Sequence, residues 1–260
     1  MDLQVTDRVY VITGGARGLG RATADVLVAE GARVVLSGRS AETLAGAAEA
    51  LGESATTVVA DNADPDTPAR LIAAAADTWG RLDGALISVG GPPVGPVAGE
   101  RGISDEQWTT AFESVFLGAV RLGRDLGGAI ADDVEETGGG ALAFVLSSSV
   151  RAPLANMAVS NGLRPGLAMV AKTLADELGP RGVRVNGLLP GRVGTERVAE
   201  LDEASGDPAA ARAAAVRGIP LGRYGEPAEF GRVAAFLLSP AASFVSGAMV
   251  PVDGGMLRAL

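Results

Sequence analysis

The sequence lacks the side chains that most enzymes use for acid–base and metal chemistry. Its 260 residues contain no histidine, no cysteine and only two tyrosines. Without cysteine there is no disulfide, thiolate nucleophile or zinc–sulfur site, and without histidine the commonest general base and metal ligand is missing. Lys172 is the only lysine, and the other 21 basic residues are arginines. We therefore expect no metal site, and any proton chemistry must use carboxylates, hydroxyls, arginine, these few residues, water or the substrate itself.

Long apolar runs and an excess of basic charge are also missing. No apolar run approaches the roughly 20 residues of a membrane-spanning helix, although 47% of the residues are hydrophobic, so no membrane partner is expected. A net charge of −9 argues against a nucleic-acid partner, because phosphate neutralisation needs clustered cations. The first residues, Met1–Asp7, contain no basic segment followed by an apolar one, as a signal peptide would. These features predict a cytoplasmic protein that acts on a small molecule.

Short β-branched runs alternate with longer Ala- and Leu-rich stretches of helical spacing along the whole chain. Such alternation predicts βαβ units, whose right-handed crossovers give one parallel sheet with helices on both faces. The expected fold is α/β, a single Rossmann-type, doubly wound domain over residues 1–260. The predicted strands are 9–12, 33–36, 56–59, 85–87, 141–146, 183–186 and 248–250. The predicted helices are 19–30, 43–51, 69–78, 108–130, 167–178 and 227–238.

A further stretch, residues 196–217, is Ala-rich, charged and helical in pattern. It follows the sixth predicted strand, at the edge where an open α/β sheet places its ligand. Two interpretations stay open, because the stretch fits a substrate lid and fits a solvated helical excursion equally well.

The strongest local motif is Thr13-Gly14-Gly15-Ala16-Arg17-Gly18-Leu19-Gly20, directly after the first predicted strand. Glycine permits a tight turn and a close approach of the backbone to a pyrophosphate. The N-terminus of the helix that follows then offers free N–H groups and the positive end of its dipole to the phosphates. The motif predicts a dinucleotide site.

The spacing of these glycines, Gly-x3-Gly-x-Gly, resembles that of the short-chain dehydrogenase/reductase family, and the resemblance extends over nearly the whole chain. Asp61-Asn62 resembles the family's acidic adenine contact, and Pro190–Thr195 resembles its segment that holds the nicotinamide amide. Gly222–Pro227 and Val252–Gly255 resemble its C-terminal signatures. Together with the loop chemistry, the resemblance implies cofactor contacts from Gly14, Arg17, Gly18, Leu19, Gly20, Ser37, Arg39, Ser40, Asp61, Asn62, Val89, Gly90, Arg164, Pro190, Gly191, Val193 and Thr195.

The choice of cofactor depends on the end of the second predicted strand. NAD-selective members of the family carry a carboxylate there for the ribose hydroxyls, but this chain has Gly38 followed by Arg39. Arg17 adds a second cation from the glycine loop. Two guanidinium groups without a carboxylate favour a 2′-phosphate, which they bind through paired charged hydrogen bonds. We therefore expect NADP(H).

The catalytic positions depart from the family's relay of Asn, Ser, Tyr and Lys. The resemblance places the serine at Ser147, the tyrosine at Ser160, the lysine at Arg164 and the asparagine at Val115. Ser160 cannot replace a phenol as an acid, because an aliphatic hydroxyl is far less acidic. Arg164 keeps a cation that can bind the ribose and stabilise an oxyanion, but it hardly transfers a proton. Lys172 lies eight residues further on, roughly 12 Å along a helix, so it does not replace the missing lysine.

Three functions remain open on these residues. The first is an NADPH-dependent reductase of a carbonyl or imine, in which Ser147 and Arg164 polarise the acceptor, with Ser160 at most a hydrogen-bond donor, and substrate or water gives the proton. The second is a redox-neutral isomerase, dehydratase or cyclase, and the third is a non-catalytic NADP(H)-binding protein. The Ala-, Gly- and Arg-rich composition is typical of high-GC bacteria and favours a specialised biosynthetic substrate. The family resemblance implies a homo-tetramer or homo-dimer packed through the long helices.

Overall fold

The predicted strands form one sheet. They are β1 (Val9–Thr13), β2 (Arg33–Gly38), β3 (Ala55–Val59), β4 (Gly84–Ser88), β5 (Gly140–Val145), β6 (Val183–Pro190) and β7 (Met249–Val252). In the computed structural model, which describes residues 1–259, they lie parallel in the order β3-β2-β1-β4-β5-β6-β7. This order reverses beside β1, which pairs with both β2 and β4. The predicted Rossmann-type, doubly wound fold is confirmed.

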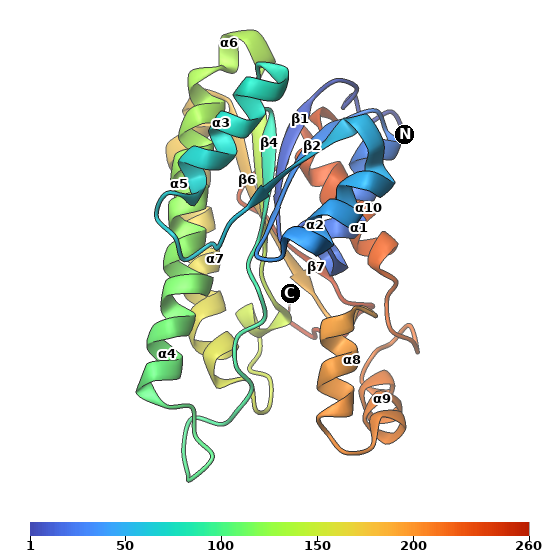
Figure 1. Cartoon of the computed structure of the whole chain (residues 1–260). Coiled ribbons are helices and arrows are strands. Elements are labelled where there is room, and N and C mark those ends of the chain that lie inside the picture. Colours follow the sequence, from blue (N-terminus) through green and yellow to red (C-terminus); the bar gives the residue numbers. More distant parts are fainter. Residues whose placement is uncertain (260) are drawn as a thin grey trace.

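Helices connect the strands and cover both faces of the sheet. Within residues 1–259 they are α1 (Gly18–Ala29), α2 (Ala41–Leu51), α3 (Thr67–Trp79), α4 (Asp105–Ala111), α5 (Gly118–Asp132), α6 (Val134–Thr137), α7 (Ala158–Leu178), α8 (Glu196–Glu203), α9 (Pro208–Arg217) and α10 (Pro227–Leu238). The helices α1, α2 and α10 pack on one face, and α3, α5 and α7 pack on the other (Figure 1). Among these described helices, none is both long and apolar enough to cross a bilayer.

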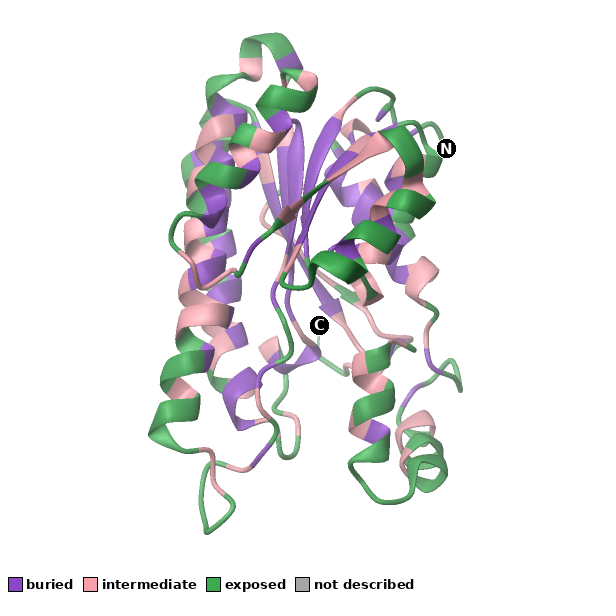
Figure 2. Cartoon of the chain, in the orientation of Figure 1, coloured by how far each residue is buried: buried purple, intermediate pink, exposed green. Residues whose placement is uncertain are grey.

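The core consists of two apolar layers, one on each face of the sheet. Leu122 and Leu126 of α5 pack in the layer that contains Phe144 of β5. Leu27 of α1 and Phe230 of α10 belong to the other layer. The central strands are buried between these layers, as strands of parallel sheets are (Figure 2). The sheet is therefore a rigid platform for residues at its carboxyl edge.

The predicted helix 108–130 is interrupted in the structure. It begins earlier, at Asp105, where Ser104 and Gln107 form a capping box. Between α4 and α5 the backbone forms a π-helical segment, Phe112–Leu117, which contains Val115. Such bulges are rare and are frequent at functional sites. The spacing of the apolar residues in the sequence does not indicate that the α-helix is interrupted by a π-helical segment.

The predicted helix 167–178 is only the second half of α7, which begins at Ala158. Gly162 and Pro165 obscured the first half, because both residues break helices in isolation. In the fold, a Cβ on Gly162 would lie 2.9 Å from the Trp108 ring, so the glycine allows α7 to pack closely. The earlier start brings Ser160 and Arg164 onto one rigid helix.

Candidate active site

The candidate site lies at the carboxyl ends of the strands, where the strand order reverses. Open α/β sheets bind their ligands at this point, which here falls between β1 and β4. Thr13 at the end of β1 ties the two strands together. Its hydroxyl donates to the Ser88 carbonyl at 2.9 Å and accepts from the Ser88 N–H at 2.8 Å. These bonds fix the position from which the glycine loop leaves the sheet.

The glycine loop turns on a left-handed backbone. Gly14 has a φ of +61° and Gly18 a φ of +58°, which residues with a side chain rarely adopt. The loop ends where α1 begins, at Gly18, and no side chain caps the first turn of this helix, which also contains no acidic residue. Its backbone N–H groups and dipole therefore form an anion-binding arrangement at the place that the sequence predicts.

The residues predicted to contact the adenosine follow β2 and β3. Arg39 and Arg17 are both exposed, and within residues 1–259 neither forms an ion pair. Ser40 instead caps α2, where its hydroxyl accepts from the Thr43 N–H at 3.3 Å. The Asp61 carboxylate accepts from the Ala63 N–H at 3.0 Å and stays exposed. This end of the site thus offers two uncompensated cations.

The residues predicted to hold the nicotinamide follow β6. Gly191 donates its N–H to the Val252 carbonyl at 3.1 Å, and Val193 is bridged to Gly225. Thr195 directly precedes α8, and its methyl group lies 3.7 Å from the point that a Cβ on Gly18 would occupy. The segment after β6 and the glycine loop therefore face each other, although about 175 residues separate them in the chain.

Three serines meet beside the end of β5. The Ser147 hydroxyl accepts from the Ser149 N–H at 3.1 Å, which leaves its own hydrogen free to donate. The Ser149 hydroxyl donates to the Ser160 carbonyl at 3.2 Å and lies 3.0 Å from the Ser160 hydroxyl. Either hydroxyl can be the donor within this pair. Sequence reasoning missed Ser149, because nothing in a run of three serines shows which one turns inward.

Arg164 follows Ser160 by one turn of α7, and its guanidinium is buried. It donates to the Val145 carbonyl at 2.6 Å and to the Val89 and Gly90 carbonyls, each at 3.4 Å. Burial lowers the pKa of this guanidinium to about 10. The side chain therefore stays charged at neutral pH and ties the ends of β4 and β5 together. Its Nε atom has no partner among the described residues.

The two tyrosines lie in other parts of the fold. Tyr10 lies in the core, and burial raises the pKa of its phenol. Tyr224 is also buried, and its hydroxyl donates to Asp202 at 3.0 Å, so burial and this hydrogen bond raise the pKa of its phenol. Lys172 is exposed on α7, eight residues beyond Arg164. The polar side chains that the structure gathers at the end of β5 are hydroxyls and one guanidinium.

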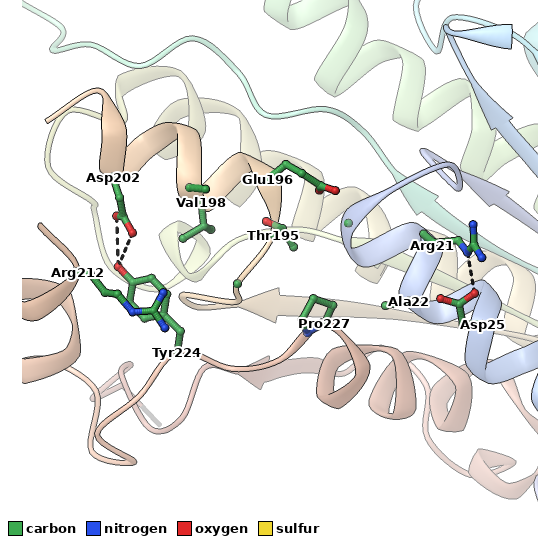
Figure 3. A pocket seen from close by; sticks show the side chains of 13 residues that line it. Arg21, Ala22, Asp25, Thr195, Glu196, Val198, Asp202, Arg212, Tyr224 and Pro227 are labelled. Atoms are coloured by element: carbon green, nitrogen blue, oxygen red, sulfur yellow. Dashed lines mark hydrogen bonds and ion pairs between the residues drawn. The ribbon is translucent and has the colours of Figure 1, made fainter. Parts of the chain in front are cut away.

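The stretch 196–217 forms two helices, α8 and α9, which we call the two-helix segment. Its helices share an anchor in Tyr224, because Asp202 of α8 accepts from the phenol and Arg212 of α9 lies 4.4 Å from the ring centre. A cavity of about 580 Å³ separates this segment from α1 (Figure 3). Thr195 and Glu196 line one wall of the cavity, and the paired Arg21 and Asp25 line the other, as the figure shows.

A dinucleotide fits the residues present. Among residues 1–259, two buried side-chain polar atoms have no hydrogen-bond partner, and these are Ser37 Oγ and Arg164 Nε. Ser37 lies near the end of β2, and Arg164 lies beside the ends of β4 and β5, so the two atoms mark opposite ends of the predicted cofactor site. Both atoms are closed to solvent in the nucleotide-free chain, so a ligand would contact them only after a local rearrangement. The uncapped turn at Gly18 lies between them.

Comparisons with known proteins show which proteins this chain resembles. The sequence profile of a family described as enoyl-(acyl carrier protein) reductase matches residues 14–257. Levodione reductase of Leifsonia aquatica is 34% identical over 265 residues, which cover 98% of this chain and 96% of that protein. Cis-4-hydroxycyclohexanecarboxylate dehydrogenase of Sinomonas cyclohexanicum is 33% identical over 252 residues, 96% of each chain. The crystal structure of L-sorbose reductase from Gluconobacter frateurii, complexed with NADPH and L-sorbose, has a TM-score of 0.91 and 29% identity and covers 100% of both chains.

Proposed function

Because the chain belongs to the short-chain dehydrogenase/reductase family, we propose that it is an NADPH-dependent oxidoreductase that reduces a carbonyl or imine of a small specialised metabolite. The names of its relatives, a levodione reductase and a cyclic-alcohol dehydrogenase, support chemistry of this class. The observation that carries the proposal is the uncapped first turn of α1, which follows the left-handed glycine loop at the point where the strand order reverses.

NADPH is preferred to NADH in this proposal. Arg17 and Arg39 are exposed and form no ion pair within residues 1–259, and Gly38 leaves no carboxylate to accept ribose hydroxyls. A 2′-phosphate would supply the negative charge that these two guanidinium groups lack. The solved L-sorbose reductase complex, which contains NADPH, supports the same choice.

The chain's own residues polarise the acceptor and hold the site rigid. Ser147 gives its free hydrogen to the acceptor oxygen, because its hydroxyl already accepts from the Ser149 N–H. The charge of Arg164 stabilises the developing negative charge on that oxygen. The bound cofactor supplies the hydride. The proton comes from the substrate or from water, because neither Ser160 nor Arg164 is a suitable acid.

Two further features belong to this proposal. The two-helix segment 196–217 acts as a lid over the substrate, as its position after β6 suggests. A second copy of the chain packs on the long helices, where Phe112 is 42% exposed and Met169 is 67% exposed. Phe112 lies in the π-helical segment between α4 and α5, and Met169 lies in α7.

The experiment that tests the proposal is a fluorescence titration of both nucleotides against wild type and Arg39→Ala. Wild type is expected to bind NADPH more tightly than NADH, and Arg39→Ala is expected to weaken NADPH binding about tenfold to a hundredfold, the range for a lost charged hydrogen bond. NADH binding should stay unchanged. Arg232→Ala, another exposed arginine, on α10, is the matched control and should change neither affinity. Equal affinities of wild type for the two nucleotides would contradict the assignment.

A further inference from the structure

One side chain connects the two-helix segment to the opposite wall of the candidate site. Arg197, in the first turn of α8, donates to the Pro92 carbonyl at 2.9 Å. Pro92 lies in the loop that follows β4, so this bond joins segments 105 residues apart. The same guanidinium approaches Glu200 of its own helix at 3.4 Å, a contact between exposed groups that contributes little. The bond to Pro92 joins the first turn of α8 to the loop after β4, whereas the contacts with Tyr224 hold the other part of the segment.

The loop is shaped to receive this guanidinium. Gly91 has no side chain, and a Cβ built there would lie 2.6 Å from Arg197 Nε and 3.1 Å from Arg197 Cζ. The guanidinium thus occupies the space that a side chain would fill. The ring of Pro92 fixes its own φ, and Pro93 restricts the ψ of Pro92. The acceptor carbonyl therefore has few other directions available, and little conformational entropy is lost when the bond forms.

The same loop is held from inside by the other arginine of the site. Arg164 donates to the carbonyls of Val89 and Gly90, which are three and two residues before the carbonyl that Arg197 contacts. Neighbouring residues of this loop are therefore held by α7 through Arg164 and by α8 through Arg197. At its far end the two-helix segment is anchored through Tyr224. Its near end, next to Thr195, depends on the contact of Arg197.

We infer that Arg197 is a positioning residue, which latches the two-helix segment onto the loop at Gly91 and Pro92 and so closes the nicotinamide end of the site. This inference rests on the proposed function for the identity of the bound nucleotide. The latch itself is a contact of the nucleotide-free chain. Loss of the latch frees α8 to move about its anchor at Tyr224, and the nucleotide then leaves more readily.

The test combines hydrogen–deuterium exchange with nucleotide binding. In Arg197→Met without nucleotide, the amides of α8 are expected to exchange about tenfold faster, as for the loss of one charged hydrogen bond at a half-exposed site. The dissociation constant and KM for NADPH should rise about tenfold, while kcat changes less than about threefold. Arg197→Lys should recover only part of the loss, because an ammonium group cannot lie flat on Gly91 and reach the carbonyl together.

Matched variants separate the latch from a general loss of charge. Arg217→Met removes an exposed arginine of the same segment, and Glu200→Gln removes the contact within α8, so both should behave as wild type. Gly91→Ala displaces the guanidinium without changing its charge and should copy Arg197→Met. In the double variant the effects should not add, because both changes break one contact.

The outcomes distinguish this inference from the proposed function. Unchanged exchange of α8 in Arg197→Met, or additive effects of Gly91→Ala, would overturn the latch. Faster exchange with unaltered NADPH affinity would show that the latch does not close the cofactor site, and would overturn the inference in that form. If wild type itself fails to bind NADPH, the proposed function is wrong, and the exchange data still decide whether Arg197 holds the segment.

Discussion

The adenosine end and the catalytic end of the site differ in what their polar groups contact. At the adenosine end, Arg17 and Arg39 are exposed and lack carboxylate partners within residues 1–259, and the first turn of α1 carries no side-chain cap. At the catalytic end, Ser149 and Ser160 bond each other, and Arg164 bonds three backbone carbonyls. The hydrogen-bond donors of the adenosine end are available to a ligand. Most donors of the catalytic end are already bonded to other groups of the protein.

This difference separates nucleotide binding from proton donation, two properties that often go together. Open donors at Arg17, Arg39 and the first turn of α1 favour tight binding of an anionic nucleotide. Closed contacts at Ser160 and Arg164 favour a rigid site that positions a substrate but has no group to give a proton readily. A chain can therefore keep its cofactor while it leaves the proton to the substrate. Each of the following changes alters one end and leaves the other intact.

The largest effect is expected from Gly18→Val, which should abolish NADPH binding in the titration. The valine would be strained at a φ of +58° and would occupy the approach of the pyrophosphate to the backbone. The matched control is Gly46→Ala, in a helix interior with no atom within 4 Å of the added Cβ. That change should leave binding intact and raise stability by about 0.5–1 kcal/mol. A folded Gly18→Val protein that binds NADPH normally would contradict the whole cofactor assignment.

At the catalytic end, Arg164→Met is expected to lower kcat/KM about a hundredfold, the usual loss for a group that stabilises an oxyanion. The change removes a buried charge and three donors, so the carbonyls at Val145, Val89 and Gly90 lose their tie. NADPH oxidation measures the loss. Arg164→Lys keeps the charge and should regain part of the activity. Wild-type rates in Arg164→Met would show that the guanidinium is only structural.

The fold was predictable because its signals are local and repeated. Every predicted strand occurs in the sheet, since β-branched runs between helical stretches leave few alternatives. The sequence misled only where packing overrides propensity. Pro165 stands inside α7, and the interruption at Phe112–Leu117 has no sign in the apolar period. Tertiary contacts decide both features, and a single sequence does not contain them in readable form.

The site residues could be predicted where the backbone geometry requires a particular residue type. The hydrogen-bond partners of the side chains were harder to predict. The glycine loop is such a geometric constraint, and the structure places it at the switch between β1 and β4. In contrast, the inward turn of Ser149 and the contact from Arg197 to Pro92 depend on rotamers and loop paths. Ser40 was expected at the cofactor, and in the structure its hydroxyl caps α2. Its predicted contact with the cofactor stays a prediction.

A smaller effect is expected from Ser160→Ala, which should lower NADPH oxidation about tenfold or less. The Ser160 hydroxyl is paired with the Ser149 hydroxyl at 3.0 Å, so its loss removes one hydrogen bond worth about 1 kcal/mol. Ser147→Ala should lose more, because that hydroxyl keeps a free hydrogen for the acceptor oxygen. A thousandfold loss in Ser160→Ala with intact NADPH binding would identify this serine as the proton donor.

The smallest effect is expected on the ultraviolet absorbance of the two tyrosines as the pH is raised to 10. Burial raises the pKa of Tyr10, and burial together with donation to Asp202 raises that of Tyr224, so neither should ionise below pH 10 in the folded chain. The unfolded chain ionises at about pH 10. The stability that these phenols contribute is therefore complete below pH 10 and is lost as the pH rises above it.

The same titration tests whether the catalytic end truly lacks a phenolic acid. A tyrosine that donates a proton during turnover would have its pKa lowered towards the working pH. Phenolate absorbance that appears well below pH 10 in the native protein would reveal such a residue. Tyr224→Phe would then assign it, because Tyr10 is the only other tyrosine in the chain. A flat absorbance up to pH 10, unchanged by saturating NADPH, would leave the substrate and water as the sources of the proton.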